Sequence, residues 1–346
     1  MLVKKESIPL LHMILVGLLP SFIKIMVYRL RGYKIDKSVS VAFGAVVIGK
    51  KVSIGSFSKV GMFTIIRADE IAIGRHVTIG SMSVMDTGKI FIDDDARVNE
   101  QVYVGGMKTP ESEIRLGKRT IVMQMSYLNP TLPIHVGDDS GIGGHCLLFT
   151  HASWNSMLDG FPVKFAPIKI GRKVWLPWRV FIMPGAEIGD EVVIAANSLV
   201  NGIIPRNTLA AGSPAKVIRE NFPQKPDNKE RDNMVNHILG EFCRYLVYNA
   251  YQADLSSALH GVVLKIAGKK NAKIHYVSSA DKFVVSGSED VYVLLNGNND
   301  DLKSLLKRGA GMAVTLSENV RAGSNDAGEE LLRFFSRYGV RFGRID

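Results

Sequence analysis

Two histidines lie six residues apart where a regular part of the sequence gives way to an irregular one. His151 follows Thr150 at the start of the irregular stretch 150–167, and His145 comes one six-residue step earlier. Histidine suits general-base chemistry because its ordinary pKa lies near neutrality. Both histidines are therefore candidates for removing a proton from a hydroxyl, and His145 competes with His151 for that role. The simpler alternative is that one or both are hydrogen-bonded turn residues.

Side chains that could bind an acceptor lie around these histidines. Trp154 and Asp159 fall in the irregular stretch, and Asn129 precedes it. An aromatic ring can stack on the face of a sugar, while amide and carboxylate groups can bond its hydroxyls. These residues, together with His145, predict a carbohydrate site, although an ordinary polar loop would have a similar composition.

The element that must position these residues is a repeat of six. Between 170 and 200 a large aliphatic residue occupies every sixth position, and a small or β-branched residue follows four positions later. The large residues are Ile170, Leu176, Ile182, Ile188, Ile194 and Val200, and the smaller ones are Val174, Val180, Ala186, Val192 and Ser198. A period of six fits neither a helix face nor simple strand alternation. It predicts a β-solenoid with the large residues in the core and the small ones at the corners.

The repeat also divides the chain into segments. We expect an N-terminal helical segment at 1–34, the solenoid at 35–222, a polar linker at 223–230 and a small α/β domain of unknown role at 231–346. Besides the stretch at 150–167, a polar loop interrupts the solenoid at 105–113. In the last domain we expect helices at 231–250, 300–308 and 327–338, and strands at 261–267, 272–277, 282–286, 291–295, 312–316 and 340–344.

The N-terminal segment is apolar and then basic. Residues 7–23 carry no charged side chain, but the run is short for a transmembrane helix, which needs about 20 apolar residues, and Pro20 interrupts it. Lysines and arginines follow from Lys24 onward. Two predictions stand: residues 8–34 contact an anionic membrane interface peripherally, or they pack as a cap across the end of the solenoid.

Composition limits the partners and the compartment. The 346 residues carry a formal net charge of +10, which suits anionic partners. We find neither zinc-finger spacing nor an RNA-binding aromatic signature, so we expect no nucleic-acid partner. The two cysteines, Cys146 and Cys243, form no CxxC pair or disulfide framework, and we expect Cys146 to be a packed core residue. We predict a cytoplasmic protein, either free or bound peripherally to the cytoplasmic face of the inner membrane.

The segment 170–219 resembles the hexapeptide-repeat acyltransferases, and most specifically their maltose and galactoside O-acetyltransferase branch. The letters that carry the resemblance are IKIGRKVWLPWRVFIMPGAEIGDEVVIAANSLV, which begin two residues earlier at Ile168, and the closing AAGSPAKVIR. Thr150-His151 precedes Ile170 by the spacing of a Thr-His pair in that branch. The resemblance covers 35–222 and implies a left-handed parallel β-helix that is usually trimeric. The predicted fold class is therefore mainly β: a left-handed parallel β-helix with an N-terminal helical segment and a small C-terminal α/β domain.

The resemblance also implies a reaction. It suggests an acetyl-CoA-dependent O-acetyltransferase acting on a sugar or polysaccharide hydroxyl in bacterial surface-polysaccharide biosynthesis, with His151 as general base in direct transfer. It places coenzyme A beside Trp175, Trp178, Ala195, Ala196, Ser198, Gly212, Lys216 and Arg219. The two basic residues could bond phosphate, or form a solvated basic end. Pro177, Ala195 and Asn197 stand where the family usually has glycine.

Other functions stay open at this point. An N-acetyltransferase acting on a nucleotide-linked amino sugar would use the same site. A γ-type carbonic anhydrase shares the solenoid, but its zinc needs three converging histidines. We predict no metal site because the candidate ligands lack that family's spacing: His76, His135, His145 and His151. The third alternative is a non-catalytic scaffold that displays the C-terminal domain.

Overall fold

The computed structural model describes residues 10–258, 261–267, 271–277, 285 and 287–345. The chain divides into two compact units, 1–224 and 225–346. Residues 1–9, and the strand expected at 282–286 apart from Val285, lie outside the described residues.

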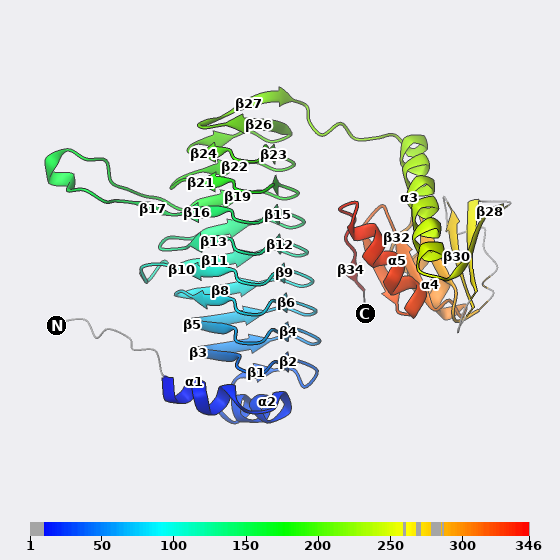
Figure 1. Cartoon of the computed structure of the whole chain (residues 1–346), viewed down its shortest axis with the longest axis horizontal. Helices are drawn as coiled ribbons and strands as arrows, with labels where there is room; N and C mark the ends of the chain where they lie inside the picture. Colours follow the sequence, from blue (N-terminus) through cyan, green and yellow to red (C-terminus); the bar gives the residue numbers. More distant parts are fainter. Residues whose placement is uncertain (1–9, 259–260, 268–270, 278–284, 286, 346) are drawn as a thin grey trace. The chain divides into compact units, whose positions relative to one another are not determined.

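The first unit is a solenoid whose coils each have three sides of short parallel strands, which we call faces 1, 2 and 3 (Figure 1). Face 1 consists of β2 (Ser40–Val41), β4 (Lys59–Val60), β6 (Thr78–Ile79), β9 (Arg97–Val98), β12 (Ile121–Val122), β15 (Gly141–Ile142), β20 (Trp175–Leu176), β23 (Val193–Ile194) and β26 (Thr208–Gly212). Strand β27 (Ala215–Glu220) pairs antiparallel with β26 and ends the solenoid.

Faces 2 and 3 share two long strands, β3 (Val46–Ile54) and β5 (Ile65–Ile73), which bend around the corner between them. Face 2 continues with β7 (Val84–Asp86), β10 (Tyr103–Gly105), β13 (Tyr127–Asn129), β16 (Leu147–Phe149), β21 (Phe181–Ile182) and β24 (Leu199–Val200). Face 3 contains β1 (Lys34–Ile35), β8 (Lys89–Ile92), β11 (Glu113–Leu116), β14 (Ile134–Val136), β19 (Ile168–Ile170), β22 (Glu187–Ile188) and β25 (Ile203–Ile204).

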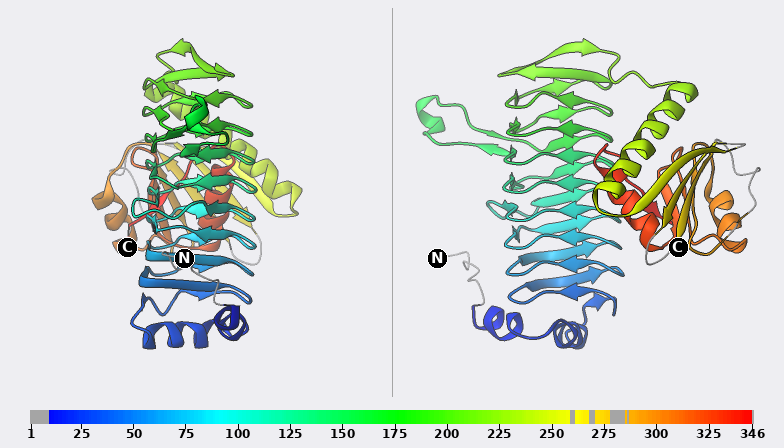
Figure 2. Two further views of the ribbon diagram at one scale, coloured as in Figure 1. Left: turned by 90° about the vertical axis from the view of Figure 1, so that its left-hand side faces the viewer. Right: turned by 45° about the vertical axis from the view of Figure 1, so that its right-hand side comes forward.

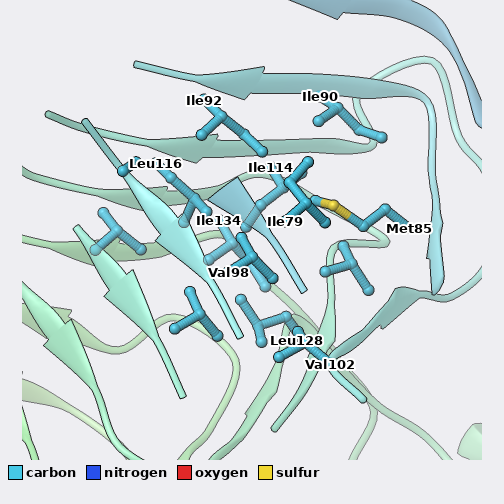
Figure 3. Close-up of a cluster of buried hydrophobic side chains, with 14 of the residues drawn as sticks. Ile79, Met85, Ile90, Ile92, Val98, Val102, Ile114, Leu116, Leu128 and Ile134 are labelled. Carbon is cyan, nitrogen blue, oxygen red and sulfur yellow. The ribbon is translucent and has the colours of Figure 1, made fainter. Parts of the chain in front are cut away.

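The sixfold repeat places side chains as the sequence predicts. Leu176 and Ile182 are fully buried, and the small residues Val180 and Ala186 fill corners at zero exposure. Figure 3 shows the same stacking of aliphatic side chains inside the middle coils. Corner hydroxyls also connect neighbouring coils: Ser58 Oγ, for example, donates to the carbonyl of Gly74 at 2.7 Å and accepts from the next coil. The core is thus a stack of aliphatic layers held in register by backbone ladders and corner hydroxyls.

Two short helices close the first coil. Helix α1 (Leu10–Gly17) leads into α2 (Ser21–Leu30), and one side of α2 packs on the solenoid. Lys24 is fully buried and its Nζ donates to the carbonyls of Ala42 and Ala45 at 2.6 and 3.0 Å. Burial lowers the pKa of this lysine. Helix α2 therefore caps the open end of the coil, since its side chains satisfy backbone groups that have no coil beneath them.

The second unit is a small α/β domain. Its strands form one mixed sheet: β28 (Gln252–Ala258), β29 (Gly261–Ala267), β30 (Ala272–Val277), β31 (Val291–Leu294), β32 (Met312–Thr315), β33 (Val320–Gly323) and β34 (Gly343–Arg344). Its helices are α3 (Asn228–Tyr248), α4 (Asn299–Lys307) and α5 (Asp326–Ser336). The sequence did not predict β28 and β33, because these segments are poor in β-branched residues and are held by pairing with β29 and β32.

The predicted fold class is confirmed: the chain is mainly β, a left-handed parallel β-helix with an N-terminal helical segment and a small C-terminal α/β domain. None of the helices in the described residues is long and apolar enough to cross a bilayer.

Candidate active site

A two-stranded arm leaves the solenoid after β16 (Figures 1 and 2). Its strands are β17 (His151–Ala152) and β18 (Lys164–Phe165), and its outer part contains the short helix η1 (Met157–Asp159). Thr150 anchors the root of the arm. Its buried Oγ1 donates to the carbonyl of Asn129 at 2.8 Å and accepts from the amide of Leu132 at 2.9 Å. His151 is consequently held as the first residue of the arm.

The imidazole of His151 is half-buried among aromatic rings. It stacks on Phe165, its partner across the arm, with ring centroids 5.8 Å apart, and meets Phe149 at 6.5 Å. Thr131 Oγ1 lies 3.4 Å from His151 Nδ1. Of the two predicted general bases, only His151 has a side-chain hydroxyl beside it among the described residues. Its other ring nitrogen, Nε2, remains to act on a substrate.

Asn129 lies next to this site but is buried. Its side chain is bonded within the protein, to Thr131 and to Tyr127. The sequence did not single out Thr131. A signal was nevertheless present in the spacing. Two repeats would separate Val122 from the next equivalent residue but one by 12 positions, whereas Val136 lies 14 positions away. The corner that carries Thr131 therefore departs from the regular spacing.

The predicted acceptor residues of the arm lie away from its root. Trp154 is 97% exposed, and Asp159 is exposed in η1. No contact joins either of them to His151 among the described residues. Only the base of the arm, at β17 and β18, is therefore part of the aromatic cluster around His151.

The other histidines are dispersed. His145 stands at a corner with a φ of 55° and its ring lies 5.5 Å from Trp178. His135 Nε2 lies 2.9 Å from Glu113, and His76 stacks on Phe57. Within the part of the chain that the structure describes, no group of three or more His, Cys, Asp or Glu side chains could hold a metal ion.

Several residues predicted to bind the cofactor occupy the corner between faces 1 and 2. Backbone bonds stack this corner in successive coils: Arg179 N donates to Gly144 O and Asn197 N to Trp178 O. Arg179 and Asn197 therefore occupy the position of His145 in the next two coils. We call the residues at this corner the corner column: His145, Trp178, Ala195, Ala196, Asn197, Ser198 and Gly212. Ser198, predicted to line the cofactor, is only 2% exposed. Ser198 joins it to the next coil by accepting from Gly212 N at 3.1 Å.

The remaining cofactor candidates lie beside the corner column. Trp175 points outward from face 1 and is 59% exposed. Lys216 and Arg219 are exposed on β27, where the guanidinium of Arg219 lies over Phe222. The corner column and His151 occupy opposite edges of face 2, separated by β16. A single chain therefore does not bring the two sets together.

Cys146 lies in the corner that precedes β16, and its thiol is inert. It is fully buried, its Sγ donates to the carbonyl of Pro177 at 3.0 Å, and burial raises its pKa to about 11. The expectation of a packed core residue is confirmed, because an inaccessible, protonated thiol is a poor nucleophile.

No family model matches the chain. The chain is 37% identical over 108 residues to a protein of Escherichia coli assigned as a colanic acid biosynthesis acetyltransferase, covering 31% of this chain and 48% of that relative. It is 54% identical over 54 residues to the galactoside O-acetyltransferase of Escherichia coli, covering 16% of this chain and 27% of that relative. The chain thus spans about half the length, or less, of these two curated relatives.

Solved structures give matches of the same kind. A hexapeptide-repeat acetyltransferase from Vibrio cholerae is 29% identical, with a TM-score of 0.31, over 34% of this chain and 67% of that chain. The resemblance to hexapeptide-repeat acetyltransferases, including a galactoside O-acetyltransferase, is confirmed by the sequence relatives.

Proposed function

We propose that this chain, whose relatives are hexapeptide-repeat acetyltransferases, transfers the acetyl group of acetyl-CoA to a carbohydrate hydroxyl in surface-polysaccharide biosynthesis. The observation that carries the proposal is the position of His151: half-buried between Phe149 and Phe165, with Nδ1 beside a hydroxyl. A partly desolvated proton acceptor, with one nitrogen engaged, is what transfer to a hydroxyl needs.

His151 would move one proton twice. Acetyl-CoA would supply the acetyl group as a thioester. Nε2 of His151 would take the proton of the acceptor hydroxyl as its oxygen bonds to the acetyl carbon, and would return that proton to the sulfur when the carbon–sulfur bond breaks. Direct transfer requires no acyl-enzyme, which agrees with the buried Cys146.

We place the acyl donor along the corner column. Trp178 offers an exposed ring, and the exposed turn at Ala195–Ala196 offers backbone groups for the amides of an extended arm. Lys216 and Arg219 provide exposed cations for phosphate. Trp175 and Gly212 add exposed surface at the end of the solenoid, and the buried Ser198 holds the amide of Gly212. This surface would fit an extended, anionic molecule.

A homotrimer would complete the site. Because the corner column and His151 lie on opposite edges of face 2, a copy packed beside face 2 could bring its column to the first copy's histidine. Face 2 has an apolar outer row: Ile65, Val84, Tyr103, Tyr127, Leu147, Phe181 and Leu199. The outer row of face 3 mixes charged, polar and apolar residues instead: Lys34, Ser53, Ala72, Phe91, Arg115, His135, Lys169, Glu187 and Ile203. Face 2 is therefore the side that gains from burial.

We assign the acceptor to the arm and to the surface beside His151 at its root. The exposed Trp154 and Asp159 would contact parts of a long carbohydrate away from the reacting hydroxyl.

Measuring acetyl transfer directly tests this function. The protein is incubated with acetyl-CoA and a panel of sugars, nucleotide sugars, amino sugars and polysaccharides, and free-thiol release is followed with product mass. We expect thiol release that depends on a carbohydrate and an ester product. An amide product would assign N-acetyl transfer instead, and the absence of acceptor-dependent release across the panel would contradict the proposal.

We also propose that the cap binds a membrane peripherally, on the cytoplasmic face of the inner membrane. One side of α2 packs on the solenoid and buries Lys24. On its other side, the side chains of Phe22, Met26 and Leu30 are 74%, 57% and 81% exposed. Helix α1 adds Ile14, Leu15 and Leu18, each more than half exposed. Arg29 and Lys37 line a surface pocket together with Phe22, Met26 and Leu30, and Arg31 and Lys34 follow shortly after α2 in the sequence. An apolar helix face edged with cations fits anionic headgroups, so capping and membrane contact use opposite sides of one helix.

The double variant Phe22→Asp/Met26→Asp tests this contact. We expect its partitioning onto vesicles of phosphatidylglycerol and phosphatidylcholine to fall at least about tenfold, because each buried apolar side chain contributes about 1.5–3 kcal/mol. Co-sedimentation measures the effect, with Val247→Asp, a charge placed at a 55% exposed apolar position of α3, as the matched control. Equal losses in the two variants, or no loss in either, would contradict membrane binding by the cap.

A further inference from the structure

A chain of hydrogen-bonded polar side chains runs to His151 from the coil beneath it. Tyr127, Asn129 and Thr131 alternate along and just beyond β13, on the coil that the anchor Thr150 also contacts. Thr131 is fully buried and Asn129 is 4% exposed. Asn129 Nδ2 donates to Tyr127 Oη at 3.3 Å, and Thr131 Oγ1 donates to Asn129 Oδ1 at 2.9 Å. Burial raises the pKa of Tyr127, so its phenol stays protonated. The series ends 3.4 Å from His151 Nδ1.

The direction of these bonds determines which nitrogen of His151 carries the proton. A threonine hydroxyl has one proton, and Thr131 gives it to Asn129. Only lone pairs of Thr131 Oγ1 are then left for His151, so Nδ1 must be the donor and Nε2 must keep its lone pair. The wrong tautomer of a catalytic histidine disables it even where the geometry is intact.

The polar loop at 105–113 fixes Thr131 from outside. Thr109 Oγ1 and Ser112 Oγ both donate to the carbonyl of Thr131, at 2.8 and 2.9 Å. Lys108 in the same loop bonds Asp86 at 2.7 Å on the solenoid. These bonds hold the backbone of Thr131 still, so its hydroxyl has a fixed position relative to the imidazole.

Gly106 covers the bond between Asn129 and Thr131. A Cβ at this glycine would lie 2.0 Å from Asn129 Oδ1 and 3.0 Å from Thr131 Oγ1. Atoms at 2.0 Å overlap, so any larger residue at 106 must displace the amide that accepts the Thr131 proton. The glycine is therefore required by the close approach of the loop to this pair.

We propose that Thr131 is a positioning residue that sets the tautomer of His151, and that Asn129 and Gly106 act through it. Asn129 then orients the hydroxyl of Thr131 and does not contact the acceptor. The inference rests on the proposed function, because a lone pair on Nε2 matters only if His151 acts as a base.

The tautomer itself is the direct test. In protein labelled with ¹⁵N-histidine, two-bond ¹H–¹⁵N spectra distinguish a protonated Nδ1 from a protonated Nε2, and His151→Gln assigns the signal. We expect protonated Nδ1 in the wild type. Thr131→Val, which keeps the shape and removes the hydroxyl, should give a mixture of tautomers and lower kcat/KM about 10- to 100-fold, a part of the usual contribution of general-base catalysis. Thr131→Ser should restore both.

Gly106→Ala tests the same arrangement without changing any of its polar groups. We expect it to shift the tautomer in the direction of Thr131→Val, while Gly202→Ala, whose Cβ would meet no atom within 4 Å, leaves it unchanged. Protonated Nε2 in the wild type, or an unchanged tautomer in both Thr131→Val and Gly106→Ala, would overturn the proposal. If the tautomer changes as expected but no acceptor is acetylated, the proposed function has failed and the positioning role has not.

Discussion

Replacing His151 by alanine is expected to lower kcat/KM for acetyl transfer about 10²–10⁴-fold, the usual contribution of a general base. Without the imidazole, the group that would take the hydroxyl proton as the oxygen attacks is lost. The fold should survive, because the ring is only half-buried and the root of the arm is held by Thr150 and by the backbone pairing of β17 with β18. Thiol release under saturating and limiting acceptor measures the change.

His135→Gln is the matched control. This histidine lies on face 3, away from the arm, and a glutamine amide can replace its bond to Glu113. We expect less than a twofold change in rate and the same melting temperature. If His151→Ala is folded and retains wild-type activity, the assignment of the base is wrong. If it unfolds, His151→Asn, which keeps a polar side chain of intermediate size, repeats the test, and wild-type activity in that variant would contradict the assignment.

The second large effect is on stability. Leu176→Ala is expected to lower the free energy of unfolding of the solenoid by about 2–5 kcal/mol, because the side chain is fully buried and the coils above and below cannot close on the cavity. Each coil contacts mainly its neighbours, so the loss should appear first as a local opening of the coils around β20. Urea unfolding followed by far-ultraviolet circular dichroism measures the free energy of unfolding, and amide hydrogen exchange measures the local opening around β20.

Ile203→Ala provides the comparison for this variant. Ile203 is also an aliphatic residue of a short strand, but its side chain is 76% exposed on face 3. Its replacement should change the free energy of unfolding by less than about 0.5 kcal/mol. Equal effects of the two substitutions would mean that the aliphatic residues at every sixth position do not form the core.

The sixfold repeat could be interpreted without coordinates because its cause is local. The positions equivalent to Leu176 and Val180 have the same surroundings in every coil, buried in the core and at a corner respectively. The same residue types therefore recur at the same spacing along the sequence. The interruption at Thr150 was visible for the same reason, and so was the unusual position of His151. The helices and most strands of the second unit followed from ordinary periodicity, whereas β28 is held by its pairing with β29 and left no local signal.

The sequence by itself determined the solenoid, its interruptions and the histidine at the root of the arm, since each depends on residue type and spacing within a few positions. Only the tertiary structure decided which side chains meet there. Thr131 and His151 are 20 residues apart, and Gly106 reaches the same cluster from another coil. Stacking of coils brings these residues together, and the lengths of the two inserted loops set the approach. The structure also separated His151 from the corner column, because adjacent corners of one coil lie a full strand apart.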